Sequence, residues 1–364
     1  MKIGILGGGQ LGRMLALAAY PLGMRVRVFD PAADACAGQV TEHVCAPFGD
    51  EAALRRFAAG LDVVTFEWEN VPEEAARLLA AELPVRPSPA ALAAAQDRLA
   101  EKNLFRSAGI ETARFLPVDS LGDLESAVPA IGVPAVLKSR RGGYDGKGQY
   151  VVRSVADIEA AWAAVGGACI VESFVEFERE LSIVAARGLG GETRFYPLVE
   201  NRHRDGILRL TLAPAPGLTP ELQAAGESIA QRVMETLEYT GVIAIELFQC
   251  GDKLLANELA TRVHNSGHWT LDGAATSQFE NHMRAVAGLP LGDASACRPT
   301  AMVNLIGAVP ATAKVLSVEG AHLHLYGKEP RPGRKLGHVN VTAADEGQLQ
   351  RRLKAVLQLL EEAS

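Results

Sequence analysis

The sequence predicts a mixed α/β and α+β protein with two or three domains. The chain has 364 residues, and a single hydrophobic core rarely serves more than about 250–300 residues. Over the first 90 residues, short apolar runs alternate with helical stretches, which is typical of a parallel sheet covered on both faces. Prolines at positions 84, 87 and 89 mark the first boundary, and the region beyond about 240 is rich in predicted strands.

Periodicity and the positions of glycine and proline predict the following helices and strands. The first half contains a strand at 2–6, a helix through 14–20, strands at 25–29 and 61–66, a helix at 92–108, and strands at 135–138, 149–153, 170–172 and 181–186. The second half contains a helix at 223–239, a hairpin at 241–259, strands at 301–306 and 322–326, and a closing helix.

Composition limits the function classes. Hydrophobic residues make up 48% and charged residues 22% of the chain, as in ordinary globular proteins. The net charge of −7 argues against nucleic acid as the main partner, because phosphate neutralisation needs a basic surface. The five cysteines are scattered without a C-x-x-C pair, which favours reduced thiols in the cytoplasm. No apolar run reaches about 18 residues, so we expect no membrane span.

The loop at 7–12 follows the pattern G-x-G-x-x-G between a strand and a helix, and Asp30 ends the next strand. This pattern is typical of a dinucleotide site, with phosphate at the helix N-terminus and a carboxylate on the ribose. Two other interpretations remain open. Either the glycines only let helix and strand pack closely, or the same crevice holds a mononucleotide that faces Gln10 and Glu67.

The hairpin at 241–259 carries two carboxylates in apolar strands. If its turn is centred on Asp252, Glu246 and Glu258 are cross-strand partners, about 5 Å apart on one face. Two carboxylates so close repel each other unless a cation lies between them, and oxygen ligands suit magnesium. The alternative is a solvated hairpin with its charges outside, which the flanking apolar residues disfavour.

The loop at 142–148 contains four glycines and Lys147. It fails the Walker pattern because no Ser or Thr follows the lysine. A glycine-rich backbone with a cation can still close over phosphates as a mobile lid. Lys138, on the preceding strand, lies within reach of the same phosphates.

The segment from Asn257 to Trp269 gathers a carboxylate, a guanidinium, two imidazoles and two amides directly after an apolar strand. Charged side chains are rarely buried without partners, so this concentration of polar groups predicts a functional site.

These features together resemble the ATP-grasp superfamily, and more specifically the 5-(carboxyamino)imidazole ribonucleotide synthetase family. The strings that carry the resemblance are Gly-Gln-Leu-Gly-Arg-Met at 9–14, Arg-Gly-Gly-Tyr-Asp-Gly-Lys-Gly-Gln at 141–149, Asp-Gly-Ile-Leu-Arg at 205–209, Arg-Val-His-Asn-Ser-Gly-His-Trp at 262–269, and Arg-Pro-Gly-Arg-Lys-Leu-Gly-His at 331–338. They span nearly the whole chain. One departure is Thr261, where the family usually has a proline that would fix the backbone before Arg262.

The resemblance implies three domains of ATP-grasp architecture. They are a Rossmann-like substrate-binding domain at 1–92, an ATP-grasp domain at 93–292 whose lid subdomain covers about 110–175, and a small α/β domain at 293–364. It further implies a cytoplasmic homodimer that binds neither nucleic acid nor membranes.

The implied reaction is the ATP- and bicarbonate-dependent carboxylation of 5-aminoimidazole ribonucleotide, with Mg²⁺ or Mn²⁺ as cofactor. The resemblance assigns Glu246 and Glu258 to the metal, and catalysis to Arg262, His264, Asn265, Tyr144 and Lys147. It assigns ATP to Arg98, Lys138, Gly143, Tyr144, Asp145, Gly146, Lys147, Gly148, Gln149, Glu172, Ser173, Phe174, Val175, Glu180, His203, Asn257 and Glu258. It assigns the ribonucleotide to Gln10, Leu11, Glu67, Tyr144, Asp145, Lys147, Arg262, Lys328, Arg334 and Lys335.

Three questions stay open at the level of sequence. The basic loop that contains Lys328 and Arg334 can be a phosphate site or a solvated surface. His264 can shuttle a proton or only bind. Two other activities also compete: another ATP-grasp carboxylate–amine ligase, and an NAD-dependent dehydrogenase built on the first glycine loop, which would leave the lid and the paired glutamates unexplained.

Overall fold

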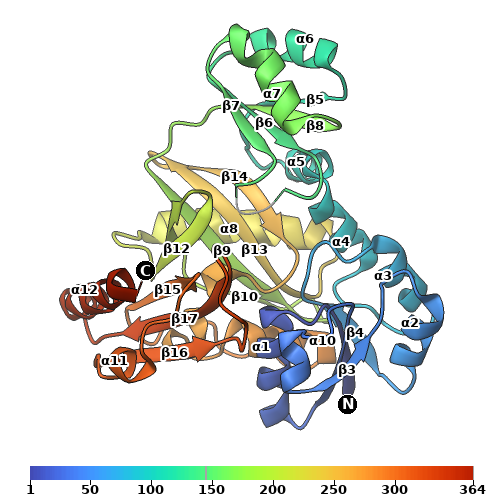
Figure 1. The fold of residues 1–364 in the computed structure, drawn as a ribbon, viewed down its shortest axis with the longest axis vertical. Coiled ribbons are helices and arrows are strands. Elements are labelled where there is room, and N and C mark those ends of the chain that lie inside the picture. The colour runs from blue at the N-terminus through green and yellow to red at the C-terminus, as the bar shows by residue number, and fades with distance from the viewer. Residues whose placement is uncertain (144–145, 364) are drawn as a thin grey trace.

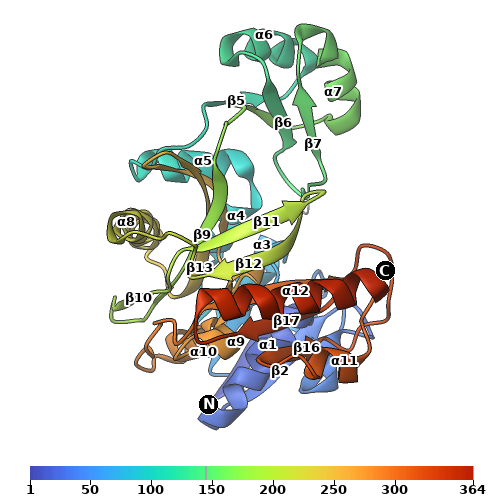
Figure 2. The same cartoon turned by 90° about the vertical axis from the view of Figure 1, so that its left-hand side faces the viewer.

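The computed structural model describes residues 1–143 and 146–363. Among these residues, no helix is both long and apolar enough to cross a membrane. An N-terminal domain and a C-terminal region flank the base of a large central sheet, and a small lid subdomain projects from its opposite end (Figures 1 and 2).

The N-terminal domain is a parallel sheet, as predicted, and its strands follow the order β3–β2–β1–β4, in which β3 was not predicted. Strand β1 is buried in all but its first residue and β4 is buried throughout, because helices cover both faces of the sheet. The elements are β1 (Lys2–Leu6), α1 (Gln10–Ala19), η1 (Tyr20–Leu22), β2 (Arg25–Asp30), η2 (Cys36–Gln39), β3 (Glu42–Cys45), α2 (Glu51–Ala58), β4 (Val63–Phe66) and α3 (Glu73–Ala80).

The helix predicted at 92–108 is two helices, α4 (Pro89–Gln96) and α5 (Arg98–Ser107). The chain is extended at Asp97, whose carboxylate accepts hydrogen bonds from the backbone N–H groups of Leu99 and Ala100. Asp97 also pairs with Arg140, which donates through Nε and Nη2 at 3.0 and 2.7 Å. The prediction was wrong because an aspartate suited to an N-cap was read as part of a continuous helix.

The lid subdomain is an antiparallel sheet in the order β5–β8–β6–β7 that packs on two helices. It lies at the far end of the molecule, above the central sheet in the view of Figure 2. Its elements are β5 (Phe115–Val118), α6 (Leu121–Ile131), β6 (Ala135–Ser139), β7 (Gln149–Val152), η3 (Val155–Asp157), α7 (Ile158–Val165) and β8 (Cys169–Ser173).

The central sheet follows the order β14–β13–β9–β11–β12–β15–β17–β16. The short strand β10 pairs with the C-terminal end of β9. Its first strands are β9 (Arg179–Arg187), β10 (Thr193–Phe195), β11 (Val199–Arg204), β12 (Ile207–Ala213), β13 (Gly241–Cys250) and β14 (Lys253–Ala260). Helix α8 (Pro220–Thr236) covers one face. The short helices η4 (Asn265–Gly267) and α9 (Thr270–Gly273) and the longer α10 (Gln278–Ala287) follow β14.

The C-terminal region continues this sheet instead of forming one of its own. It consists of β15 (Thr300–Ile306), α11 (Thr312–Leu316), β16 (Ala321–Leu325), β17 (Lys335–Thr342) and α12 (Glu346–Ala363). Because β15 pairs with β12, the predicted boundary near residue 292 does not interrupt the sheet.

Strands β11, β12 and β17 were not predicted. They contain polar residues that face inward: the Asn201 amide donates to Ser182 and accepts from Thr211, and His338 and Asn340 of β17 are fully buried. Polar residues that are buried in pairs remove the alternation of apolar and polar residues by which a strand is recognised. For the same reason Lys335, predicted to lie in a basic loop, is in fact the first residue of β17.

Candidate active site

One cavity of about 1010 Å³ lies where the three parts of the chain meet. Its walls come from the first glycine loop, the segment after β4, the loop at 142–149, the β13–β14 hairpin, the segment after β14, and the start of β17. The predicted residues that line it are Gln10, Leu11, Glu67, Arg98, Gly143, Gly146, Lys147, Gln149, Glu180, His203, Glu246, Asn257, Glu258, Arg262, His264, Asn265 and Lys335.

Other predicted residues are not among those that line this cavity. These are Lys138, Gly148, Glu172, Ser173, Phe174, Val175, Lys328 and Arg334. Tyr144 and Asp145, predicted to bind ATP and the ribonucleotide, lie outside the described residues.

The two hairpin glutamates are cross-strand partners, as predicted, although the turn is not where it was predicted. Cys250 pairs with Lys253, so the turn is the two-residue Gly251–Asp252, half a residue away from Asp252. The register then shifts between Glu246 and Leu247, because the extra residue Asn257 forms a bulge opposite them. This bulge restores the pairing of Glu246 with Glu258.

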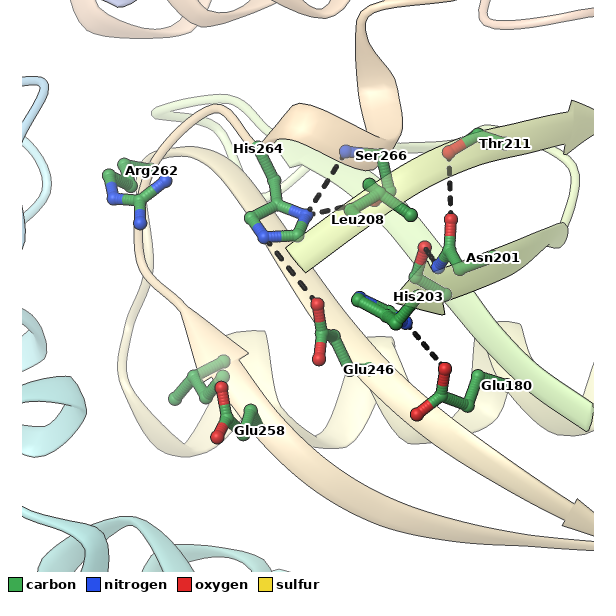
Figure 3. A network of polar contacts seen from close by, with 12 residues as sticks. Glu180, Asn201, His203, Leu208, Thr211, Glu246, Glu258, Arg262, His264 and Ser266 are labelled. Carbon is green, nitrogen blue, oxygen red and sulfur yellow. Dashed lines mark hydrogen bonds and ion pairs between the residues drawn. The ribbon is translucent and has the colours of Figure 1, made fainter. Parts of the chain in front are cut away.

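The two carboxylates have unlike surroundings (Figure 3). Burial and the neighbouring Glu258 raise the pKa of Glu246. Burial also opposes ionisation of Glu258, but Arg98, which donates to its Oε1 at 2.5 Å, and Lys138 hold the pKa of Glu258 below its usual value. Repulsion between two such groups is the condition that a bound cation relieves.

Oxygen donors in this number fit magnesium. Mg²⁺ usually takes one or two protein carboxylates and completes its shell with water and nucleotide phosphate oxygens. The described residues contain no cluster of three or more His, Cys, Asp or Glu side chains that would hold a metal ion. Glu246 and Glu258 therefore suit a cation that arrives with a phosphate ligand.

Behind the hairpin, one buried carboxylate joins two lysines. Glu172 lies 2.9 Å from Lys102 Nζ and 2.7 Å from Lys138 Nζ, and all three side chains are at most one-tenth exposed. Burial disfavours the ionised carboxylate, yet Lys138 and Lys102 lower the pKa of Glu172 to about 2. Lys102 also donates to the backbone carbonyl of Asn257 at 2.8 Å. The Glu172 carboxylate thus holds the lysines in place from behind and does not face the cavity.

The described part of the glycine-rich loop contributes Gly142, Gly143, Gly146 and Lys147 to the wall of the cavity. Gly142 has φ +73°, and no atom of the described residues lies within 4 Å of where its Cβ would be. Gly146 approaches the β11–β12 turn so closely that a Cβ would lie 3.0 Å from the Cα of Gly206. The loop therefore rests on this turn, which explains why the Asp205–Gly206 string belongs to the site although it is far away in sequence.

The first glycine loop is occupied by the protein's own carboxylates. Glu67 accepts hydrogen bonds from the N–H groups of Gly9 and Gly12 at 2.9 and 3.1 Å, and Asp30 accepts from Gly8 at 2.7 Å. A Cβ on Gly7 would lie only 2.7 Å from Glu67. The donors that a dinucleotide phosphate needs are filled, so this geometry contradicts the dinucleotide interpretation. Gln10 and Glu67 still face the cavity.

Arg262 and Asn265 have polar atoms without partners among the described residues. Arg262 donates through Nη2 to Glu69 at 2.7 Å and through Nη1 to the carbonyl of Val263 at 3.0 Å. Its buried Nε, however, and both amide atoms of the Asn265 side chain have no hydrogen-bond partner in this part of the chain. A buried unpaired polar group costs about 1–3 kcal/mol, and both residues line the cavity. Both residues therefore carry polar atoms at the cavity wall that the described part of the protein leaves unpaired.

His264 is held in one orientation (Figure 3). Its Nδ1 accepts from the backbone N–H of Ser266 and lies 2.9 Å from the Ser266 hydroxyl. Its backbone N–H and carbonyl are both bound by the buried side-chain amide of Gln278. Because a backbone N–H can only donate, this pattern assigns the ring proton to Nε2, which lies 3.6 Å from Glu246.

Glu180 and His203 face the same cavity from neighbouring strands β9 and β11, where Glu180 contacts the His203 ring. Burial disfavours the imidazolium, but Glu180 and Glu246 raise the pKa of His203 above its usual value.

The basic residues near the C-terminus divide between two cavities. Lys335 lines the large one, whereas Lys328 and Arg334 line a second cavity of about 310 Å³ beside it. Lys328 donates to the side-chain oxygen of Gln10, and burial lowers the pKa of Lys328. Lys328 therefore stands at the wall between the two cavities.

Several cavity residues were not predicted, among them Trp68, Glu69, His268 and Tyr326. Glu69 is the one with a visible signal, since it follows the same strand end as Glu67. His268 and Tyr326 both contact His338, which is far from His268 in the sequence and 12 residues from Tyr326.

Three family models match the chain in order. They are the ribonucleotide synthetase preATP-grasp domain at residues 1–96, the ATP-grasp domain at 103–279, and the phosphoribosylaminoimidazole carboxylase C-terminal domain at 300–352. The sequence is 52% identical to the N5-carboxyaminoimidazole ribonucleotide synthase of Pseudomonas aeruginosa, over 99% of this chain and 100% of that protein. It is 43% identical to the synthase of Mycobacterium tuberculosis, over 96% and 85%.

Solved structures give the same result. The N5-carboxyaminoimidazole ribonucleotide synthetase of Thermus thermophilus matches with a TM-score of 0.95 and 56% identity, covering 98% of both chains. The Aspergillus clavatus synthase, in complex with ADP and 5-aminoimidazole ribonucleotide, matches with a TM-score of 0.92 and 32% identity, covering 99% of this chain and 98% of that one. These matches confirm the ATP-grasp architecture and the resemblance found in the sequence.

Proposed function

Because the chain belongs to the N5-carboxyaminoimidazole ribonucleotide synthase family, we propose that it carboxylates the amino group of 5-aminoimidazole ribonucleotide, using ATP and bicarbonate. The products are N5-carboxyaminoimidazole ribonucleotide, ADP and phosphate, and the step belongs to purine biosynthesis. The enzyme is thus an ATP-dependent ligase that forms a carbon–nitrogen bond.

The observation that carries the proposal is the pairing of two half-sites in one cavity. Glu246 and Glu258 supply a cation site for a nucleotide. Arg262 and Asn265, which line the same cavity, carry donors and an acceptor that are unpaired within the described residues. Bicarbonate carries anionic oxygens that accept and a hydroxyl that donates, so it matches this set.

The reaction proceeds by phosphoryl transfer and then carboxylation. A bicarbonate oxygen attacks the γ-phosphorus, the bond to the β-phosphate oxygen breaks, and ADP leaves, which gives carboxyphosphate. Cleavage of its carbon–oxygen bond releases carbon dioxide and phosphate within the cavity. The amine of the ribonucleotide attacks the carbon dioxide carbon, and the nitrogen gives up one proton as the carbamate forms.

The residues of this chain position the reactants and balance their charge. For ATP we propose Arg98, Lys138, Gly143, Tyr144, Asp145, Gly146, Lys147, Gly148, Gln149, Glu172, Ser173, Phe174, Val175, Glu180, His203, Asn257 and Glu258. Of these, Glu172 acts through Lys138, which it contacts directly. For the ribonucleotide we propose Gln10, Leu11, Glu67, Tyr144, Asp145, Lys147, Arg262, Lys328, Arg334 and Lys335.

Arg262, His264 and Asn265 would bind bicarbonate and the carbon dioxide formed from it. The hydrogen bonds to Nδ1 of His264 leave its Nε2–H as a donor toward the cavity. This supports a binding role for His264 over that of a proton shuttle.

Mg²⁺ or Mn²⁺ would be held by Glu246 and Glu258. When bound, the metal supplies charge neutralisation for the phosphate groups of ATP. We further propose a cytoplasmic homodimer, with the domains divided at about residues 92 and 292.

The test measures ADP release with magnesium, ATP and bicarbonate, with and without 5-aminoimidazole ribonucleotide. We expect strong stimulation by the ribonucleotide in the wild type and its loss in Glu258→Gln. Turnover that ignores the ribonucleotide would favour another ATP-grasp carboxylate–amine ligase. Absence of turnover together with tight NAD binding would favour the dehydrogenase instead. The loop at 7–12 argues against that activity, because Glu67 already accepts the hydrogen bonds of its N–H groups.

A further inference from the structure

The salt bridge between Glu69 and Arg262 connects two segments that lie 193 residues apart. Glu69 follows β4 of the N-terminal domain, and Arg262 follows β14 of the central sheet. The side chains are only 27% and 14% exposed, and Glu69 Oε2 lies 2.7 Å from Arg262 Nη2. A charge-assisted bond in such partial burial fixes the orientation of a guanidinium more firmly than a solvated one.

The segment that carries Glu69 is itself held on both sides. Two residues earlier, Glu67 accepts from Gly9 and Gly12 of the first glycine loop. The backbone carbonyl of Glu69 accepts from the side-chain amide of Gln96 at 2.8 Å. A shift of the glycine loop would therefore be transmitted through Glu67 to Glu69.

Two nitrogens of the Arg262 guanidinium donate hydrogen bonds, and the third has no partner among the described residues. Nη2 binds Glu69 and Nη1 binds the carbonyl of Val263, while the buried Nε has no partner among the residues that the structure describes. The two committed nitrogens define the plane of the guanidinium. Without Glu69, the bond to the neighbouring carbonyl would be its one remaining hydrogen bond to the residues that the structure describes.

We propose that Glu69 is a positioning residue that couples the ribonucleotide half of the cavity to the bicarbonate half. By holding Arg262, it keeps bicarbonate and the carbon dioxide formed from it beside the amine until the carbon–nitrogen bond is made. This inference rests on the proposed function of the same cavity. It adds that ATP consumption and carboxylation are tied together by one carboxylate of the N-terminal domain.

The expected signature is uncoupling, which is distinct from a general loss of activity. If Arg262 is loosened, carbon dioxide escapes before the amine captures it, and ADP forms without product. In Glu69→Ala we expect KM for bicarbonate to rise about tenfold, the effect of losing one charge-assisted hydrogen bond. The ratio of ADP formed to ribonucleotide consumed should rise from about one to two or more.

The chain offers a matched control in the neighbouring helix. Glu73 also forms a salt bridge, with the exposed Arg77 one helical turn away, at 2.7 Å and outside the cavity. Glu73→Gln should therefore leave both the ratio and the bicarbonate KM at wild-type values. A second variant, Glu69→Gln, keeps a hydrogen-bond acceptor without the charge and should fall between the wild type and Glu69→Ala.

A double-mutant cycle decides whether Glu69 acts through Arg262. In an Arg262→Ala background, Glu69→Ala should change the ratio no further. A ratio that stays at one in Glu69→Ala, or an additive effect in the double variant, would overturn the inference while leaving the carboxylase assignment intact. A wild type that consumes no ribonucleotide would overturn the proposed function and the inference with it.

Discussion

The two glycine-rich loops of this protein look alike in sequence and differ in what faces their backbone. The loop at 7–12 is closed by Glu67 and Asp30, which accept hydrogen bonds from its N–H groups. The loop at 142–148 lines the large cavity, and no side chain of the described residues fills the space beside Gly142. A glycine pattern therefore indicates that another group approaches the backbone closely. Whether this group is a ligand or a side chain of the protein depends on which hydrogen-bond acceptors lie near the loop.

A second contrast concerns the buried carboxylate next to each loop. Glu67 binds neutral backbone N–H groups. Glu172, behind the cavity, binds the two lysines Lys102 and Lys138. Removing the first carboxylate leaves neutral donors without an acceptor, whereas removing the second leaves two buried cations without a counter-charge.

The largest expected effect follows from this contrast. Glu172→Gln should lower the free energy of unfolding by about 3–5 kcal/mol, because it breaks a buried ion pair from one side. Glu67→Gln should cost about 1–3 kcal/mol, since an amide oxygen still accepts one of the two N–H groups. Urea unfolding of both variants beside the wild type measures the difference. Equal losses would mean that the charge of the lysines is neutralised by another route.

The two carboxylates should also respond to pH with opposite sign. The pKa of Glu172 falls from 4.5 to about 2 in the folded protein, so its contribution of about 3 kcal/mol is complete above pH 4.5 and is lost as the pH falls toward 2. Burial raises the pKa of Glu67 above 4.5, so its contribution is greatest below pH 4.5 and declines as the pH rises through the folded value.

Stability curves from pH 2 to pH 8 for the wild type and the two glutamine variants check this prediction. The difference between wild type and Glu172→Gln should grow with pH between 2 and 4.5. The difference between wild type and Glu67→Gln should shrink as the pH rises above 4.5. Parallel curves for all three proteins would contradict both assignments.

Alanine substitutions at one glycine of each loop test whether the space beside the backbone is filled or open. Gly7 and Gly142 both have positive φ, at +100° and +73°, so alanine strains either backbone by about 1 kcal/mol. Only at Gly7 would the new Cβ also press on Glu67, at 2.7 Å. We expect Gly7→Ala to cost about 2–4 kcal/mol in total, and Gly142→Ala about 1 kcal/mol. Thermal unfolding of the pair measures this, and a larger loss at Gly142 would mean that the open loop is the constrained one.

The sequence predicted the open loop better than the closed one, for a physical reason. That the loop at 142–148 borders a binding cavity is predicted by local features, namely its glycines, its lysine and the adjacent strand. The acceptor for the loop at 7–12 is Glu67, 55 to 58 residues from the glycines that it binds, and nothing near the loop indicates it. Glu69 follows the same strand end as Glu67, but its partner Arg262 is 193 residues away in the chain, so its contact with Arg262 could not be predicted.

The paired glutamates show a prediction that was confirmed although one of its premises was wrong. Alternation along the two strands, counted from a turn at Asp252, predicted the pairing of Glu246 with Glu258. The real turn is shorter, and the bulge at Asn257 compensates for it. A bulge has no reliable signature in a single sequence, since it depends on how two strands meet. Fold class and paired carboxylates were therefore within reach of the sequence, and the details of register were not.

The smallest expected effect concerns Thr261, which lies directly before Arg262. Its side chain is fully buried, and its hydroxyl has no hydrogen-bond partner within the described ranges 1–143 and 146–363. Replacing the hydroxyl by a methyl group in Thr261→Val removes an unsatisfied polar atom at nearly constant volume, so the free energy of unfolding should rise by about 1 kcal/mol. Thr261→Ser, which keeps the hydroxyl and loses the methyl group, is the matched control and should lower it by about 1 kcal/mol. If valine destabilises the protein as much as serine does in urea unfolding, the hydroxyl has a partner in solution, and Arg262 is held by one more contact than Glu69 and Val263 provide.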